Sequence, residues 1–291
     1  PAALRPLLDL RITTKRLKKT DPRFAGIDSI LKWMLVTCFG YTGYKNAKFG
    51  RIEVHEGITG RSRDILLRTK DIAEEMGFTV LHGIVDCLWV QGEHASRMKE
   101  RVEQETGLHT TLDTYDWLVF LPLADGLGAY NRYYGRLSDG SLKVRGIASR
   151  RGDTPAYVRE MQERMLDLLK EARDQAGLRE YREEVRQIYR EAVDGLDGVP
   201  PASLAVHRQV SRLRYTRACP EASAVAACAA AGIDLSPGME VSYVVTDALS
   251  WAVELDWDAT RFDQGYYRKL LGKAWEEVLF ALDRAKSPGE A

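Results

Sequence analysis

The sequence has few cysteines and no paired cysteine motif. Its 291 residues include four cysteines, which lie far apart at Cys38, Cys87, Cys219 and Cys228. None of them belongs to a Cys-x-x-Cys pair or to a cluster of cysteine and histidine. Structural zinc sites and disulfide frameworks depend on such groupings, so the sequence predicts neither.

The sequence also lacks long apolar runs and an excess of charge of either sign. No stretch reaches the length that spans a membrane, and no signal peptide is recognisable, so a cytoplasmic protein with no membrane contact is expected. Its 42 basic and 42 acidic residues give a formal net charge of +0, so the molecule as a whole has no electrostatic preference for nucleic acid. Local clusters of charge therefore decide the question of partners.

Internal repeats and low-complexity segments are absent as well. The composition, 45% hydrophobic and 29% charged, is ordinary for a globular protein, and the length suffices for two or three packed units. The first residue is Pro and not Met, which fits a fragment or a processed form of something longer.

A hairpin of two apolar strands is predicted over residues 77–90, with a tight turn at Val85 and Asp86. Strand interiors disfavour Asp, and burying an unpaired carboxylate costs several kcal/mol or forces its protonation. Asp86 is therefore expected at the tip of the hairpin. There it is either a polar turn residue or a functional carboxylate, and the stretch alone favours the turn residue.

Residues 1 to about 46 predict a basic pair of helices. The first helix ends at Asp21 and Pro22, because the residue before a proline avoids the α region. The first 50 residues hold ten Lys or Arg and three Asp, a local net charge of +7. Arg11 and Lys15 share one helical face, and a second helix folded back would bring Lys32 near them. Such cations suit a triphosphate, although a solvated basic face is the simpler interpretation.

Helices and antiparallel strands alternate through the rest of the chain, which predicts an α+β fold. Thr154 is the expected N-cap of a helix that Pro155 begins. Before it, helices are expected over 57–76 and 93–106, and strands over 117–121, 129–135 and 142–147. After it come helices up to Pro200, strands near 204–207, 241–245 and 251–253, and helices over 222–231 and 266–282.

Taken in order, these segments resemble the fingers, palm and thumb of a family B DNA polymerase of the archaeal type, over essentially the whole chain. Residues 6–8 with Arg11 and Lys15 resemble the start of the fingers. Residues 32–44 resemble K-x-x-x-N-S-x-Y-G-x-x-G, and residues 82–87 resemble Y-x-D-T-D-S of the palm. Residues 145–153 resemble R-G-(I/L)-E-x-x-R-R-D, and residues 237–243 resemble P-G-x-x-(I/V)-x-Y of the thumb. Each motif is weak alone, and their order and spacing carry the resemblance.

The resemblance implies a palm-like antiparallel sheet with helices, a helical-hairpin fingers insertion and a mainly helical thumb. The corresponding domains are 1–46 as fingers, 47–153 as a partial palm and 154–291 as thumb. The implied chemistry is nucleotidyl transfer by two Mg²⁺ ions, with Asp86 as catalytic carboxylate and metal ligand. The implied partners are primer–template DNA and deoxynucleoside triphosphates.

The resemblance also assigns binding roles. Arg11, Lys15 and Lys32 match the cations that grip the triphosphate, and the ring of Phe39 is placed under the sugar of the nucleotide. The implied DNA contacts are Arg132, Tyr133, Arg145, Arg151 and Tyr215, with Arg150 in the same basic cluster.

Several positions depart from the family pattern. Ile84 replaces the first Asp of the palm pair, Val36 replaces the Asn of the fingers motif, and His82 and Asn131 replace a Tyr and a Lys. The earlier palm strand, with its D-x-x-S-L-Y-P motif, has no counterpart in this sequence. A lone Asp86 cannot hold two divalent ions, which need oxygen ligands from several groups.

Three interpretations follow. The favoured one is a polymerase homologue that binds primer–template DNA and nucleotide, with catalysis lost or strongly impaired. The alternative is an active polymerase fragment, whose missing carboxylate comes from an absent N-terminal segment or a second polymerase chain. The third is a structural partner in a replication or repair assembly with no nucleic-acid role. Its only support is the neutral net charge. Without the earlier palm strand, the sheet is expected to expose an edge that a partner strand or a dimer would cover.

Overall fold

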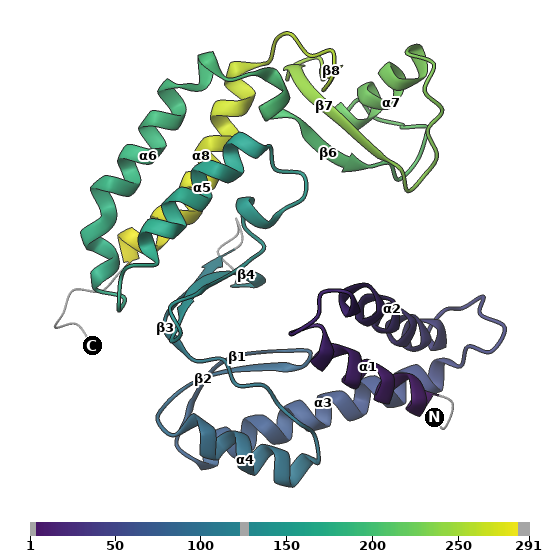
Figure 1. The fold of residues 1–291 in the computed structure, drawn as a ribbon, viewed down its shortest axis with the longest axis vertical. Coiled ribbons are helices and arrows are strands. Elements are labelled where there is room, and N and C mark those ends of the chain that lie inside the picture. Colours follow the sequence, from purple (N-terminus) through teal and green to yellow (C-terminus); the bar gives the residue numbers. More distant parts are fainter. Residues whose placement is uncertain (1–3, 123–127, 285–291) are drawn as a thin grey trace. The chain divides into compact units, whose positions relative to one another are not determined.

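The computed structural model of the chain describes residues 4–122 and 128–284 (Figure 1). The chain divides into two compact units, residues Pro1–Leu112 and Asp113–Ala291. We call them the first and the second unit and describe each by itself. Among the helices in the described part, none combines the length and apolar character that crossing a membrane requires.

The first unit opens with the expected pair of helices, α1 (Arg5–Leu17) and α2 (Phe24–Thr42), which pack against each other. In the turn between them, the carboxylate of Asp21 accepts a hydrogen bond from the backbone N–H of Arg23 at 3.0 Å. Two further helices follow, α3 (Ile52–Glu75) and α4 (Ala95–Thr106). Helix α3 begins five residues earlier than predicted.

The predicted hairpin is present as β1 (Thr79–Ile84) and β2 (Cys87–Gln91), with Ile84 opposite Cys87. Val85 has a φ of +51°, the left-handed conformation that a two-residue hairpin turn requires. Asp86 completes this turn. Both strands pack against α3, and the small core of the unit consists of Ile72, Ala73, Phe78, Met98 and Val102.

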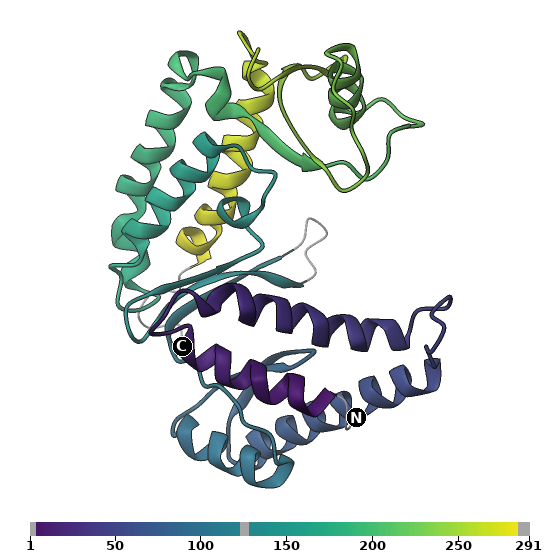
Figure 2. The same cartoon turned by 45° about the vertical axis from the view of Figure 1, so that its right-hand side comes forward.

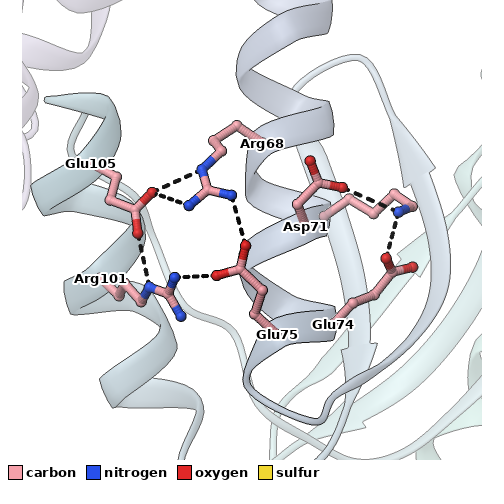
Figure 3. Close-up of polar contacts among 7 residues, drawn as sticks. Arg68, Asp71, Glu74, Glu75, Arg101 and Glu105 are labelled. Atoms are coloured by element: carbon pink, nitrogen blue, oxygen red, sulfur yellow. Dashed lines mark hydrogen bonds and ion pairs between the residues drawn. The ribbon is translucent and has the colours of Figure 1, made fainter.

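A ring of ion pairs joins α3 to α4 on the surface of the first unit (Figure 3). Arg68 pairs with Glu75 at 2.9 Å and with Glu105 at 2.5 Å, and Arg101 pairs with Glu105 at 2.8 Å and with Glu75. The hydrogen bonds from Arg68 and Arg101 lower the pKa of Glu75. Single exposed pairs contribute little to stability, but this closed ring supplements a small hydrophobic core.

The second unit opens with an antiparallel sheet of β3 (Tyr115–Pro122), β4 (Gly128–Leu137) and β5 (Leu142–Arg145), in that spatial order. Helices α5 (Ala156–Leu169), α6 (Arg182–Asp194) and α8 (Gln264–Arg284) lie side by side in both views of the chain (Figures 1 and 2). A second sheet contains β6 (Val206–Gln209), β7 (Glu240–Asp247) and β8 (Ala252–Leu255), against which α7 (Pro220–Ala230) packs. Short 3₁₀ turns are Ala148–Arg150, Gly177–Tyr181, Leu196–Gly198 and Pro201–Leu204.

Buried polar side chains of the first sheet bind the backbone of the helical part of this unit. The indole N–H of Trp117 donates to the carbonyl of Ala172 at 2.9 Å, and the guanidinium of Arg136 donates to the carbonyl of Lys170 at 2.8 Å. The hydroxyl of Tyr134, which is fully buried, donates to the carbonyl of Glu277 at 3.2 Å. These bonds fix the sheet against the helices, because a buried polar group left unpaired is costly.

The structure confirms the α+β fold and changes two details of the prediction. The strands expected in a single palm-like sheet form two sheets, β1–β2 and β3–β4–β5. Thr154 is not the N-cap of α5; Pro155 holds that position, and Thr154 is buried. The boundary between the two units, at 112/113, falls inside the proposed palm. The division into fingers, palm and thumb stays a prediction.

Gly146 offers a test of how tightly the second unit is packed. Its φ is +66°, and a Cβ atom there would lie 2.1 Å from the carbonyl oxygen of Asn131. We expect Gly146→Ala to lower the free energy of unfolding by at least about 2 kcal/mol, from backbone strain and the clash together. The measurement is urea unfolding, read as a shift of the midpoint at constant slope.

Gly152→Ala is the matched control, since a Cβ atom at Gly152 would meet nothing within 4 Å. Its expected effect is within about 0.5 kcal/mol. Equal effects of the two substitutions would contradict the close approach of Gly146 to Asn131.

Candidate functional site

The cations of the first helical hairpin gather around one acidic side chain, Asp28 of α2. Its carboxylate is buried and pairs with Lys18, and it lies 3.7 Å from Nε of Arg11. The hydrogen bond from Lys18, with the charges of Lys18, Arg11 and Lys15, lowers the pKa of Asp28. Asp28 is therefore ionised at neutral pH and occupies part of the surface that Arg11 would offer to a phosphate.

Lys15 and Lys32 remain open to solvent. Both are exposed, and no ion pair reaches either of them within the described residues. Lys32 lies one helical turn after Asp28 and so shares its side of α2. Of the three cations predicted to grip a triphosphate, one is thus shared with an acid and two are available. The sequence prediction missed Asp28, although an acid on an otherwise apolar helix is a recognisable signal.

The ring of Phe39 is stacked on a histidine. Its centroid lies 4.5 Å from that of His55, at an interplanar angle of 21°, and Phe39 is 38% exposed. Nδ1 of His55 lies 3.3 Å from the hydroxyl of Thr42. One face of the Phe39 ring is therefore used inside the protein, and His55 is a neighbour that the sequence did not indicate.

Asp86 is exposed at the tip of the β1–β2 hairpin. Within residues 4–122 and 128–284, no ion pair involves Asp86, and no group of three or more His, Cys, Asp or Glu residues could hold a metal ion. Ile84, two residues earlier, carries a hydrocarbon side chain. The donor set of the described residues therefore does not fit a pair of Mg²⁺ ions, which need several oxygen ligands.

Two of the predicted DNA contacts, Arg132 and Tyr133, are engaged inside the second unit. The guanidinium of Arg132 lies 2.7 Å from a carboxylate oxygen of Glu277 and donates to the carbonyl of Pro122 at 3.0 Å. Tyr133 is only 8% exposed, with its ring 5.8 Å from that of Phe120. The surface that these two side chains could offer to DNA is therefore small.

Arg145, Arg150 and Arg151 are exposed around the 3₁₀ turn that follows β5. The interior of this turn is anchored by two buried side chains, Glu277 and Gln162. The N–H of Ala148 donates to Glu277 at 2.9 Å, and the N–H of Ser149 donates to Gln162 at 2.6 Å. Gln162 also donates to Glu277 at 2.8 Å. The three arginines therefore stand on a fixed backbone.

Tyr215 lies in a basic loop between β6 and α7. Its ring is half-buried, and the guanidinium of Arg212 lies 5.9 Å from its centroid. Arg212, Arg214 and Arg217 are exposed, and no ion pair reaches them in the part of the chain that the structure describes. We missed these three arginines, although their spacing within six residues was a usable signal. An exposed arginine loop of this kind suits contacts to phosphates.

Comparison with known proteins matches the resemblance seen in the sequence. No family model matches the chain. It is 38% identical to "DNA polymerase 2" of Saccharolobus solfataricus over 166 residues, 57% of this chain and 25% of that protein. It is 26% identical to the "DNA polymerase" of Thermococcus sp. (strain 9oN-7) over an alignment of 302 positions, 92% of this chain and 36% of that protein.

A solved structure shares the fold. The family B DNA polymerase from the hyperthermophilic archaeon Pyrobaculum calidifontis aligns with all of this chain at a TM-score of 0.57 and 24% identity, over 38% of its own length. At this identity the likeness shows the fold alone. The chain thus spans only about a quarter to two-fifths of the length of these proteins.

The position of Asp28 among the cations leads to a prediction. Asp28→Asn removes the negative charge that Arg11 and Lys18 now share, so the affinity of the first unit for a nucleoside triphosphate should rise roughly fivefold at low salt. The measurement is titration of a fluorescent nucleotide at low and at moderate salt.

Asp21→Asn is the matched control, because it changes the net charge equally but affects only the ion pair and the backbone hydrogen bond with Arg23 in the turn. Unchanged affinity in Asp28→Asn, or an equal rise in both variants, would show that the cations around Asp28 do not bind the triphosphate.

Proposed function

We propose that this chain, a homologue of part of the archaeal family B DNA polymerases, binds primer–template DNA and deoxynucleoside triphosphates, with nucleotidyl transfer lost or strongly impaired. In this proposal residues 1–46 are the fingers, 47–153 a partial palm and 154–291 the thumb. The observation that carries the proposal is a contrast among the described residues: many exposed cations have no ion-pair partner there, and the hairpin tip carries one carboxylate, Asp86.

The DNA-binding part of the proposal is supported by two sets of exposed arginines in the second unit. One set surrounds the anchored 3₁₀ turn, and the other lies in the loop before α7. An arginine without an acidic partner can neutralise a DNA phosphate and release the counterion condensed there. This release favours binding whatever the base sequence. Tyr215 would add a ring beside the second set, whereas Arg132 and Tyr133 would support the backbone and not touch DNA.

The nucleotide-binding part is supported by Lys15 and Lys32, which are exposed, and by Arg11, which is held beside them. Developing charge on a triphosphate is balanced by such cations. The exposed part of the Phe39 ring remains available to a sugar, while His55 fixes the orientation of that ring.

The impaired chemistry follows from the donor set. Two divalent ions would activate the 3′ hydroxyl of the primer and stabilise the leaving pyrophosphate. Asp86 is able to contribute oxygen ligands to one such ion, and the hydrocarbon side chain of Ile84 contributes none. We therefore derive no catalytic step through these residues.

A second candidate function is an active polymerase in which another segment or a second polypeptide supplies the missing carboxylate. The observation in its favour is that Asp86 is exposed and has no ion-pair partner in the described residues, as an unfilled ligand would be. The partial coverage of the longer relatives is compatible with such a segment.

DNA binding by six exposed arginines should depend steeply on salt. We expect the affinity for a primer–template duplex to fall about 10³-fold between 50 and 200 mM salt, whatever the base sequence. The double substitution Arg150→Ala/Arg151→Ala should reduce the slope of log K against log salt by about 2. Fluorescence anisotropy with two unrelated sequences measures both quantities.

Arg186→Ala is the control, because Arg186 is already paired with Glu183 on α6. It should leave the slope unchanged. Absence of binding, or an affinity that does not change with salt, would contradict a DNA-binding function.

Primer extension separates the two candidate functions. If nucleotidyl transfer is lost or strongly impaired, the wild-type protein should extend a primer no further than the Asp86→Ala variant does, first in Mg²⁺ and then in Mn²⁺. The wild type and the variant should bind primer–template equally well. The assay uses the longest natural form of the protein. Extension that Asp86→Ala abolishes would instead establish the active polymerase, with its missing carboxylate supplied elsewhere.

A further inference from the structure

The loop between α2 and α3, residues 43–51, displays two aromatic rings to solvent. Phe49 is 79% exposed and Tyr44 is 57% exposed. We call this segment the tip loop. Large apolar rings held in water are unfavourable for a folded protein, and their grouping commonly marks a binding surface.

Hydrogen bonds within the tip loop and to the end of α2 brace its backbone. The hydroxyl of Tyr41 accepts a bond from the N–H of Lys48 at 3.1 Å, and the carbonyl of Ala47 accepts one from the N–H of Gly50 at 3.2 Å. A Cβ atom at Gly50 would lie 2.9 Å from the carbonyl oxygen of Tyr41, so the backbone is closely packed there. The two exposed rings are therefore presented on a braced backbone, and such bracing lowers the entropy cost of binding.

Three cations accompany the rings. Lys45, Lys48 and Arg51 are exposed, and no ion pair reaches them within the described residues. The ammonium of Lys48 lies 5.5 Å from the centroid of the Phe49 ring. Residues 42–45 and 50–53 line a pocket of about 630 Å³ at the base of the loop. Stacking surfaces, unpaired cations and a pocket thus occupy one short segment.

We propose that the tip loop binds an unpaired nucleic-acid strand, with bases stacked on Phe49 and Tyr44 and phosphates contacted by Lys45, Lys48 and Arg51. Aromatic rings can stack only on bases whose faces are exposed, and the interior of a duplex hides those faces. The proposal rests on the DNA-binding function above and deepens it, because it gives the single-stranded template overhang a site apart from those for duplex and triphosphate.

Substitutions at Phe49 separate stacking from simple apolar contact. Phe49→Leu keeps an apolar side chain and loses the ring, whereas Phe49→Trp keeps a ring. We expect Phe49→Leu and Tyr44→Ala each to weaken binding of a primer–template with a long 5′ overhang about tenfold, with Phe49→Trp close to the wild type. Binding of a blunt duplex should stay unchanged in all three. Fluorescence anisotropy with the two labelled DNAs measures these affinities on the whole chain.

Trp257→Leu is the matched control, since Trp257 is an exposed ring, 58% accessible, in the second unit. It should leave both affinities unchanged. Circular dichroism and thermal melting serve to verify that each variant is folded, which is expected for substitutions at exposed positions.

Two results would overturn the proposal while leaving DNA binding intact. Equal affinity of Phe49→Leu and the wild type for the overhang would show that the rings serve another partner, such as a protein. An equal loss on overhang and on blunt duplex would show that the loop does not distinguish an unpaired strand. A wild-type protein that binds neither DNA would instead refute the proposed function, and this site with it.

Discussion

The second unit depends on the buried carboxylate of Glu277. Charge in a protein interior is tolerated only where it is paired and hydrogen-bonded, and Glu277 is satisfied from three segments far apart in the sequence. Arg132 of β4, the backbone of the 3₁₀ turn at Ala148 and the amide of Gln162 on α5 all donate to it. One side chain of α8 thereby fixes a strand, a turn and a second helix. The exposed arginines on either side of the turn take their position from this buried network.

The first unit uses an acid in a similar way, at Asp28. In both units a cation expected to meet a ligand also contacts a carboxylate of the protein: Arg11 lies 3.7 Å from Asp28 and remains partly available, whereas Arg132 is bound by Glu277 at 2.7 Å. The cations without such partners lie on exposed turns, loops and helix faces, where their charge remains available. Contact with an acid therefore limits what a cation can offer to a phosphate, fully for Arg132 and partly for Arg11.

Local features were predictable from the sequence, and long-range pairings were not. The strands flanking Asp86 and the helix break at Pro22 follow from short-range pattern and turn chemistry, and the structure confirms both. The engagement of Arg132 could not be foreseen, because its partner Glu277 lies 145 positions away in the sequence. The arginines at 212, 214 and 217 were visible in the sequence and were overlooked.

Binding and chemistry make different demands on such a fold. Affinity for a polyanion is a sum of many small contributions from exposed cations, so the loss of one contact changes it only modestly. Two-metal chemistry requires a few oxygen ligands in strict geometry, so one hydrocarbon side chain in place of a carboxylate removes much of the site. A chain with exposed arginines, and with Ile84 two residues before Asp86, can therefore meet the demands of phosphate binding while this hairpin offers few oxygen ligands for metal ions. This difference in demands is the physical basis of the proposal that the chain binds DNA while nucleotidyl transfer is impaired.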